Sequence, residues 1–259
     1  MHKQLISAIS QIANTNLEIS EFYEQWWSGT LHGPVKVEPV KQSLYDPIKV
    51  KVLELDGSAV FSNGYKLFSA APGEYIRTSE TDANIIRRES WANPSWNWWQ
   101  SRQPFNYPKQ NLIRLYLPTP LPGQSISTLT LQETFTKHNL PVTLKWRRAQ
   151  GAFSDNTVIW IESSSLKIVL RSLKDLLGHA NFLQAPPPLS LNFHGIGIAD
   201  HPKDGSSLGW MFTELMWPLV KAGEASLVAK AFEIRGLDLH RPWLFNHETP
   251  PTRWDEALE

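Results

Sequence analysis

Residues 141–161, PVTLKWRRAQGAFSDNTVIWI, contain two short strands on either side of a polar connection. In PVTLKWR, apolar side chains alternate with Thr, Lys and Arg, which is the period of a strand with one apolar face. TVIWI is rich in β-branched and aromatic residues, which strands favour. We therefore predict strands at 141–147 and 157–161.

The neighbouring segments extend this pattern in both directions. NLIRLYL at 111–117 predicts another strand, and helical periodicity predicts helices at 125–139 and 163–177. The order strand, helix, strand, strand, helix is not a strict βαβ alternation, so we expect an α+β fold with a mostly antiparallel sheet flanked by helices. Further helices are expected at 3–13, 17–27 and 224–234, and Gly205-Ser206-Ser207 is expected to lead into another that runs to about Val220.

The rest of the chain has weaker patterns. Strands are expected at 48–55 and 59–61, whereas 74–108 combines a tryptophan cluster with three prolines and predicts loops and short helical turns. The tail, 242–259, has little periodicity, and we expect it on the surface. With 259 residues, of which 41% are hydrophobic, a single α+β domain spanning 1–259 is the first expectation.

Composition excludes several classes of protein. Lys plus Arg and Asp plus Glu number 25 each, so the basic excess of a nucleic-acid binder or of a protein attracted to anionic membranes is absent. The chain has no cysteine, which rules out thiolate nucleophiles, disulfides and cysteine zinc sites. The apolar residues of 1–19 are interrupted by polar ones, unlike those of a signal peptide. We expect a cytoplasmic protein.

Metal and cofactor motifs are weak. His194 and His201 are seven residues apart, with Asp200 and Asp204 nearby, but the spacing matches no familiar ligand motif. Phosphate-binding, dinucleotide-binding and nucleophile-elbow motifs are also missing from the sequence. We expect no cofactor.

Cations on the predicted strands suggest an anion site. A period of two places Arg114 on one face of its strand, and Lys145 and Arg147 together on one face of theirs. If these strands lie in one sheet with the three side chains on the same face, they form a cluster suited to phosphate oxygens. The alternative is the solvated face of an amphipathic sheet.

Tryptophan is abundant, with 12 residues in the chain. Trp91, Trp96, Trp98 and Trp99 lie within nine positions, interleaved with Asn93, Pro94 and Asn97. They either belong to a large aromatic core or line a groove for a peptide or another apolar ligand. We predict that at least one of these four rings lines a surface groove.

Several segments of the second half, taken together, resemble a known family. They are NLIRLYLPTP, LPVTLKWRRA, FSDNTVIWIES and the late run LNFHGIGIADHPKDGSSLGWMFTELMW. The pattern combines an Arg-bearing strand (Arg114), a Lys-bearing strand (Lys145), an aspartate before an apolar strand (Asp155) and a Gly-Ser turn that opens a helix. Over about residues 110–220 the chain resembles the HopA-type family of type III secretion effectors, which includes bacterial relatives encoded beside lanthipeptide-type peptide modification pathways.

The resemblance implies a fold like that of the phosphothreonine lyases and a function in peptide modification. Such relatives are thought to eliminate phosphate from phosphoserine or phosphothreonine in a precursor peptide, after a kinase-like partner protein has installed it. Elimination needs a base with a lowered pKa, and Lys145, which matches the family's Lys-bearing strand and is flanked by Arg147 and Arg148, is the best candidate. Arg114 would bind phosphate. His194 is the best candidate for the acid on chemical grounds, since the family motif does not clearly provide it. The remaining candidates for substrate binding are Arg147, Arg148, Asp155 and Trp98.

A second hypothesis is a non-catalytic peptide-binding effector or subunit on the same fold. Two positions that carry cations in the family lack them here, since the chain has Leu191-Asn192 in the late loop and Ala152-Phe153-Ser154 before Asp155. Fewer cations would weaken a phosphate site, and the tryptophan-rich segment would then serve for binding alone.

Overall fold

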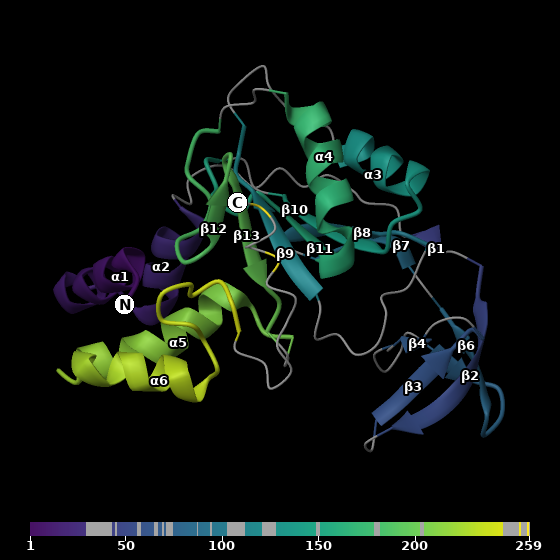
Figure 1. Cartoon of the computed structure of the whole chain (residues 1–259), viewed down its shortest axis with the longest axis horizontal. Coiled ribbons are helices and arrows are strands. Elements are labelled where there is room, and N and C mark those ends of the chain that lie inside the picture. The colour runs from purple at the N-terminus through teal and green to yellow at the C-terminus, as the bar shows by residue number, and fades with distance from the viewer. Residues whose placement is uncertain are drawn as a thin grey trace.

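The computed structural model describes residues 1–29, 43–44, 46–55, 58–64, 67–68, 70, 75–86, 88–93, 95–102, 112–120, 128–148, 151–178, 182–202, 205–245, 254 and 258. The strands form two antiparallel sheets, and helices flank the larger one (Figure 1), so the α+β class with mostly antiparallel strands is confirmed. The larger sheet has eight strands, which in spatial order are β1 (Ser43–Leu44), β7 (Arg88–Ala92), β8 (Trp96–Gln100), β10 (Val142–Arg147), β11 (Thr157–Glu162), β9 (Leu112–Leu117), β13 (Ile196–Asp200) and β12 (Leu191–Phe193).

The smaller sheet has a core of its own. Its five strands, in spatial order, are β4 (Leu67–Phe68), β3 (Ser58–Ser62), β2 (Ile48–Leu55), β6 (Asp82–Ile85) and β5 (Tyr75–Arg77). Val50, Val52, Phe61, Ala83 and Ile85 form its hydrophobic cluster. Figure 1 shows this sheet set to one side of the larger sheet and its helices.

One face of the larger sheet packs on α3 (Thr128–Lys137) and α4 (Leu166–Leu177), the latter preceded by a short helical turn at Ser163–Ser165. The buried side of α4 repeats at helical spacing, with Leu166, Val169, Leu170 and Leu173. These residues meet the apolar side of the strands, including Leu115, Leu144 and Ile159, in one cluster. The alternation seen in the sequence therefore directs the apolar side chains of β9, β10 and β11 to this core.

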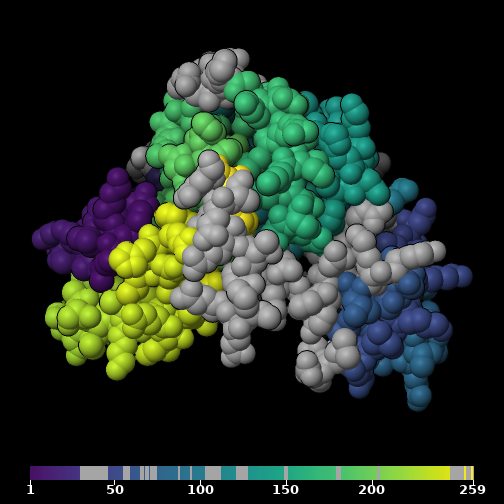
Figure 2. All heavy atoms as spheres, in the orientation of Figure 1, coloured from purple at the N-terminus to yellow at the C-terminus, as the bar shows by residue number. Residues whose placement is uncertain are grey.

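The opposite face is covered by helices from both ends of the chain. These are α1 (Lys3–Asn14), α2 (Ile19–Tyr23), the π-helical turn η1 (Glu24–Ser28), α5 (Leu208–Lys221) and α6 (Val228–Ile234), with a short turn at Ala225–Leu227 before α6. Figure 2 shows the N-terminal helices against α5 and α6. None of the helices in the described part of the chain is long and apolar enough to cross a membrane.

Trp27 joins these helices to the sheet. Its ring is fully buried, stands edge-on to Tyr116 of β9 with centroids 5.7 Å apart, and packs against α5 at Gly209. A Cβ atom at Gly209 would lie 2.2 Å from the indole. The absence of a side chain at Gly209 is therefore what lets α5 approach Trp27.

The expectation of loops and helical turns for 74–108 is wrong over its described residues, which contain β5, β6, β7 and β8. β8 alternates, with Trp96 and Trp98 half-buried on one face and Asn97 and Trp99 buried on the other. Its periodicity was hidden because both faces carry tryptophan. The turn before β8 is closed by Asn93, whose side-chain oxygen accepts hydrogen bonds from the backbone N–H groups of residues 95 and 96.

The described residues of the tail do not lie on the surface as expected. Leu244, Phe245 and Trp254 are buried. The carboxylate of Asp200, at the end of β13, accepts hydrogen bonds from the Phe245 N–H at 2.9 Å and the Trp254 indole N–H at 2.7 Å. A buried carboxylate therefore holds Phe245 and Trp254, two residues from a segment whose sequence has little periodicity.

The contact between Trp27 and α5 gives a test of this packing. Replacing Gly by Ala inside a helix ordinarily stabilises it by about 1 kcal/mol. At Gly209 we expect the reverse, a destabilisation of about 1–3 kcal/mol, because the new methyl group overlaps the indole. Urea unfolding of Gly209→Ala measures the sign, with Glu214→Ala on an exposed position of the same helix as the control. A more stable Gly209→Ala variant would show that Trp27 does not pack here as described.

Candidate functional site

The register of the larger sheet brings the predicted cations to one face. Lys145 lies opposite Val158 of β11, and Val158 lies opposite Tyr116 of β9. Arg114 pairs in the same way with Trp160 of β11. Because opposite residues of an antiparallel pair share a face, Arg114 and Lys145 project from the same side, as predicted, with β11 between their strands. We call this side of the larger sheet the cation face.

Lys145 is enclosed by tryptophan rings. Its Nζ atom lies 3.8 Å from the ring centroid of Trp96, 5.3 Å from that of Trp98 and 5.5 Å from that of Trp160. Within the described residues, the structure shows no salt bridge of this amine. Lys145 is thus held by aromatic faces, which attract its charged form.

The pKa of Lys145 is lowered to about 7, chiefly because burial disfavours the charged form of the amine. Asp155 opposes this shift, and the charges of Arg114 and Arg147 make smaller contributions to it. The sequence predicted a lowered pKa but attributed it to neighbouring arginines alone. Desolvation has the larger effect, because β8 and β11 place indole rings where water would otherwise solvate the amine.

Arg114 is buried, with 5% of its surface exposed, and its guanidinium is hydrogen-bonded to other groups of the protein. Its Nε donates to Nδ1 of His201 at 2.9 Å, and a terminal nitrogen donates to the Ser206 carbonyl at 2.6 Å. The guanidinium also lies 5.4 Å from the Trp160 ring centroid. Since Nδ1 of His201 accepts a hydrogen bond, a neutral ring carries its proton on Nε2. Sequence reasoning noted His201 only as a weak metal ligand, because nothing in the pattern links it to Arg114.

Arg147 and Asp155 form a buried ion pair. One terminal nitrogen of Arg147 lies 2.9 and 3.2 Å from the two carboxylate oxygens of Asp155 and donates to the Ser28 hydroxyl at 2.7 Å. Glu24 is 3.9 Å from the same nitrogen, and burial raises the pKa of Glu24 while Arg147 lowers it. Arg147 therefore reaches the cation face as predicted and meets Asp155 there, and each already compensates the charge of the other.

Three buried polar atoms near this pair have no hydrogen-bond partner among the described residues. They are Oε2 of Glu24, the hydroxyl of Tyr116 and Nε of Arg147. Burial raises the pKa of Tyr116 to about 12, so its hydroxyl keeps its proton at neutral pH. Since buried polar groups are nearly always satisfied, water or a polar ligand is the natural partner for these atoms.

Trp98 occupies the centre of a stack of rings. It lies parallel to Trp91, with centroids 5.5 Å apart, and to Trp160, with centroids 5.6 Å apart. Trp91, Trp96 and Trp98 are half-buried, whereas Trp99 belongs to the core on the other face. The four rings are thus not all buried, and the groove that one of them would line stays a prediction.

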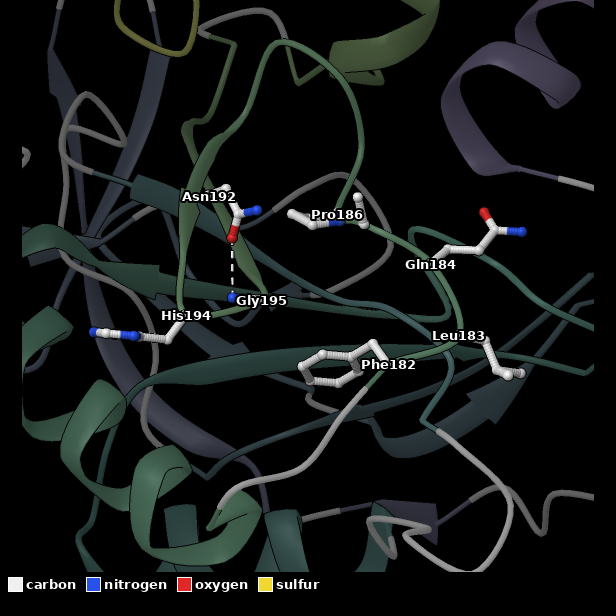
Figure 3. A pocket seen from close by; sticks show the side chains of 8 residues that line it. Phe182, Leu183, Gln184, Pro186, Asn192, His194 and Gly195 are labelled. Carbon is white, nitrogen blue, oxygen red and sulfur yellow. Dashed lines mark hydrogen bonds between the residues drawn. The ribbon is translucent and has the colours of Figure 1, made fainter.

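The structure does not bring His194 and Arg148 to Lys145. His194 is exposed in the turn between β12 and β13, and β13 is three strand steps from β10, which is about 14 Å. It lines a different cavity, of about 410 Å³, beside Phe182 and Asn192 (Figure 3). A terminal nitrogen of Arg148 donates to the Asn93 carbonyl at 2.7 Å in the β7–β8 turn.

Within the described residues, no group of three or more His, Asp or Glu side chains is placed to hold a metal ion. A scan against protein-family models found no match, and a search of curated proteins found none. The site is therefore characterised by its own geometry.

The lowered pKa of Lys145 has a consequence for stability. Between pH 7 and the ordinary value of 10.5, the folded protein holds Lys145 neutral and the unfolded chain holds it protonated. In this window the unfolded chain binds one proton more than the folded protein does. Lowering the pH therefore favours the unfolded chain, and the contribution of Lys145 reduces the free energy of unfolding as the pH falls. We expect Lys145→Met to be more stable than the wild type, by a margin that grows from about pH 10 to about pH 7.

Urea unfolding across this pH range measures the margin, and Lys137→Met, at an exposed position of α3, controls for the change of side chain. A margin that stays constant with pH would show that Lys145 ionises as an ordinary lysine.

Proposed function

We propose that this chain is a phosphoserine or phosphothreonine lyase that eliminates phosphate from a peptide and leaves dehydroalanine or dehydrobutyrine. The observation that carries the proposal is Lys145, an amine with a pKa of about 7 on a sheet face that also bears Arg114 and Arg147. An ordinary lysine is protonated at neutral pH, whereas this one is available as a base.

The reaction needs one base and a site for the leaving group. The Nζ atom of Lys145 takes the proton from the α-carbon of the phosphorylated residue. The electron pair left on the α-carbon forms the Cα–Cβ double bond as the Cβ–O bond breaks, and phosphate leaves with the electrons of the Cβ–O bond. Arg114 and the ionised Lys145 lower the energy of the departing phosphate, because fixed positive charge acts strongly in a site shielded from water.

The protonated hydroxyl of Tyr116 and the Nε2 atom of His201 are the proposed donors to the leaving phosphate, in place of His194, which the sequence analysis took as the acid. Tyr116 faces the same side as Lys145, and His201 is held by Arg114. The half-buried rings of Trp98 and Trp160 offer apolar surface to the peptide around the reacting residue.

The resemblance to the HopA-type family and its lanthipeptide-pathway relatives supports the same reaction and a fold like that of the phosphothreonine lyases. By the same resemblance we propose that the reaction takes place in the bacterial cytoplasm, on a precursor peptide that a kinase-like partner protein has phosphorylated. No cofactor, nucleic acid or membrane takes part in the proposed reaction.

A specific observation favours a second function, non-catalytic binding of a peptide. Arg147 is paired with Asp155, and Arg114 bonds His201 and Ser206, so both arginines already have protein partners. A phosphate would have to share them. In this alternative the tryptophan-lined face binds a peptide without any reaction.

The proposed base is tested by Lys145→Ala. We expect the rate of phosphate loss from a phosphothreonine peptide to fall roughly 10²- to 10⁴-fold, since a general base contributes about that much. Mass spectrometry of the peptide measures the loss of phosphoric acid, with Lys137→Ala as the matched control on an exposed lysine. An unchanged rate in Lys145→Ala would remove this residue from the mechanism, and a wild type that binds phosphopeptides without eliminating phosphate would favour the second function.

Arg114 is expected to affect substrate binding more than the chemical step, because it grips phosphate in both the ground state and the transition state. Steady-state kinetics of Arg114→Ala should show KM raised more than kcat is lowered. Since Arg114 also holds His201 and Ser206, thermal unfolding accompanies the kinetics, and Arg114→Lys separates loss of charge from loss of these bonds. A fall in kcat at constant KM would contradict the assigned role.

A further inference from the structure

Three cavities that share lining residues form one groove, and residues of η1 line two of them. The middle one, of about 490 Å³, lies between α1, η1 and residues 184–188. It shares Gln11, Gln25 and Trp26 with a cavity of about 440 Å³ at the end of α1. It shares residues 184–186 with the cavity of about 410 Å³ shown in Figure 3. We call this continuous depression the amide groove.

The wall formed by α1 is polar but uncharged. Gln4, Ser7, Gln11 and Asn14 follow one another at spacings of three, four and three, so they form a single stripe along the helix. The buried side of the same helix consists of Leu5, Ala8 and Ile12. A surface helix usually presents charged side chains opposite its apolar face, and this stripe has none.

The wall of the groove opposite α1 also carries carboxamide side chains. Gln25 extends from η1 with its side chain exposed, and Gln184 is fixed by a bond from its Nε2 to the Ala152 carbonyl at 2.8 Å and by one from the Ser154 hydroxyl at 3.1 Å. Pro186 and Pro188 add rigid apolar surface. Across the three cavities, the described lining residues include no Lys, Arg, Asp or Glu.

We propose that the amide groove binds an extended polypeptide segment without charged side chains. A carboxamide both donates and accepts hydrogen bonds, as a peptide group does, so a row of carboxamides complements a backbone. On α1, Gln4 uses its oxygen to accept from a backbone N–H, whereas Gln11 and Asn14 use their nitrogens to donate within the helix. The other polar atom of each side chain remains to bind a peptide group. The ten residue steps from Gln4 to Asn14 span about 15 Å of helix, which matches about five residues of extended chain.

Other ligand classes fit less well. A nucleic acid or an anionic lipid surface needs cations, and the described lining has no Lys or Arg. A glycan site usually offers an open aromatic face, whereas the Trp26 ring stacks on Phe22 with centroids 5.6 Å apart and an interplanar angle of 15°.

The groove is adjacent to the cation face but chemically separate from it. Ser154 lines the groove, and the next residue, Asp155, forms the ion pair with Arg147 on the other side of η1. The proposal does not rest on the lyase reaction, because the groove needs no phosphate to bind a peptide. If both proposals hold, the groove binds a part of the peptide remote from the reacting residue.

A pool of unphosphorylated, randomised peptides of about ten residues, lacking Lys, Arg, Asp and Glu, tests the groove directly. We expect immobilised wild-type protein to enrich a subset of the pool, identified by mass spectrometry. The Kd of an enriched peptide, measured by fluorescence anisotropy, should rise about tenfold or more in Gln11→Glu and in Gln25→Glu, because each places a charge against uncharged peptide groups.

Ser10→Glu is the matched control, since it adds the same charge at an exposed position of α1 that does not line the groove. It should leave the Kd unchanged, and so should Lys145→Ala. Circular dichroism establishes that the variants fold. The proposal is overturned if no peptide is enriched, if Gln11→Glu and Gln25→Glu bind as the wild type does, or if the groove retains neutral oligosaccharides in place of peptides.

Discussion

The buried ion pair between Arg147 and Asp155 is the constraint on which the second face of the larger sheet depends. A sheet in this fold has to bury both faces, and this one carries cations on one of them. Arg147 is compensated by Asp155, and the pair reaches across to Ser28, the last residue of η1. Removing either partner alone would leave an uncompensated buried charge, which is strongly destabilising. The pair therefore fixes where the N-terminal helices meet the sheet. It also sets the position of the Trp27 ring, because Trp27 precedes Ser28 in η1.

Lys145 differs from its neighbours Arg114 and Arg147 because they are hydrogen-bonded to other protein groups, whereas its amine lies among aromatic rings. Asp155 lies near enough to raise its pKa, but the described salt bridges of this carboxylate go to Arg147. The amine is left with aromatic neighbours, which attract a cation less strongly than water solvates it, and the balance favours the neutral form. Burial among indole rings and the engagement of the nearest carboxylate thus act together. Burial of the amine therefore lowers the pKa of Lys145 more than the nearby positive charges do.

The strands of the second half could be predicted because their signal is local. The alternation in 112–117 and 142–147 is enough to put the cation of each strand opposite its apolar side chains, and the apolar run before Glu162 is enough for β11. That Arg114 and Lys145 face the same side follows only from the register across β11. The tryptophan strand β8 could not be found in the same way, because both of its faces carry indole rings. His201 and the buried tail could not be found either. The bond from Arg114 to His201 spans 87 positions and the one from Trp254 to Asp200 spans 54, and no period in the sequence encodes such partners.

The position of α1 has a consequence for how the chain folds during synthesis. The N–H group of His2 donates to the Leu239 carbonyl, Gln4 accepts from the N–H of Leu189, and the apolar side of the helix packs in a cluster with α5 and α6. This helix is therefore synthesised well before the segments that it packs against in the folded protein. Closing so long a loop is slow and entropically costly. The sheet with α3 and α4 can assemble earlier, while the layer that shields the cation face is completed only after Leu239 has been added to the chain.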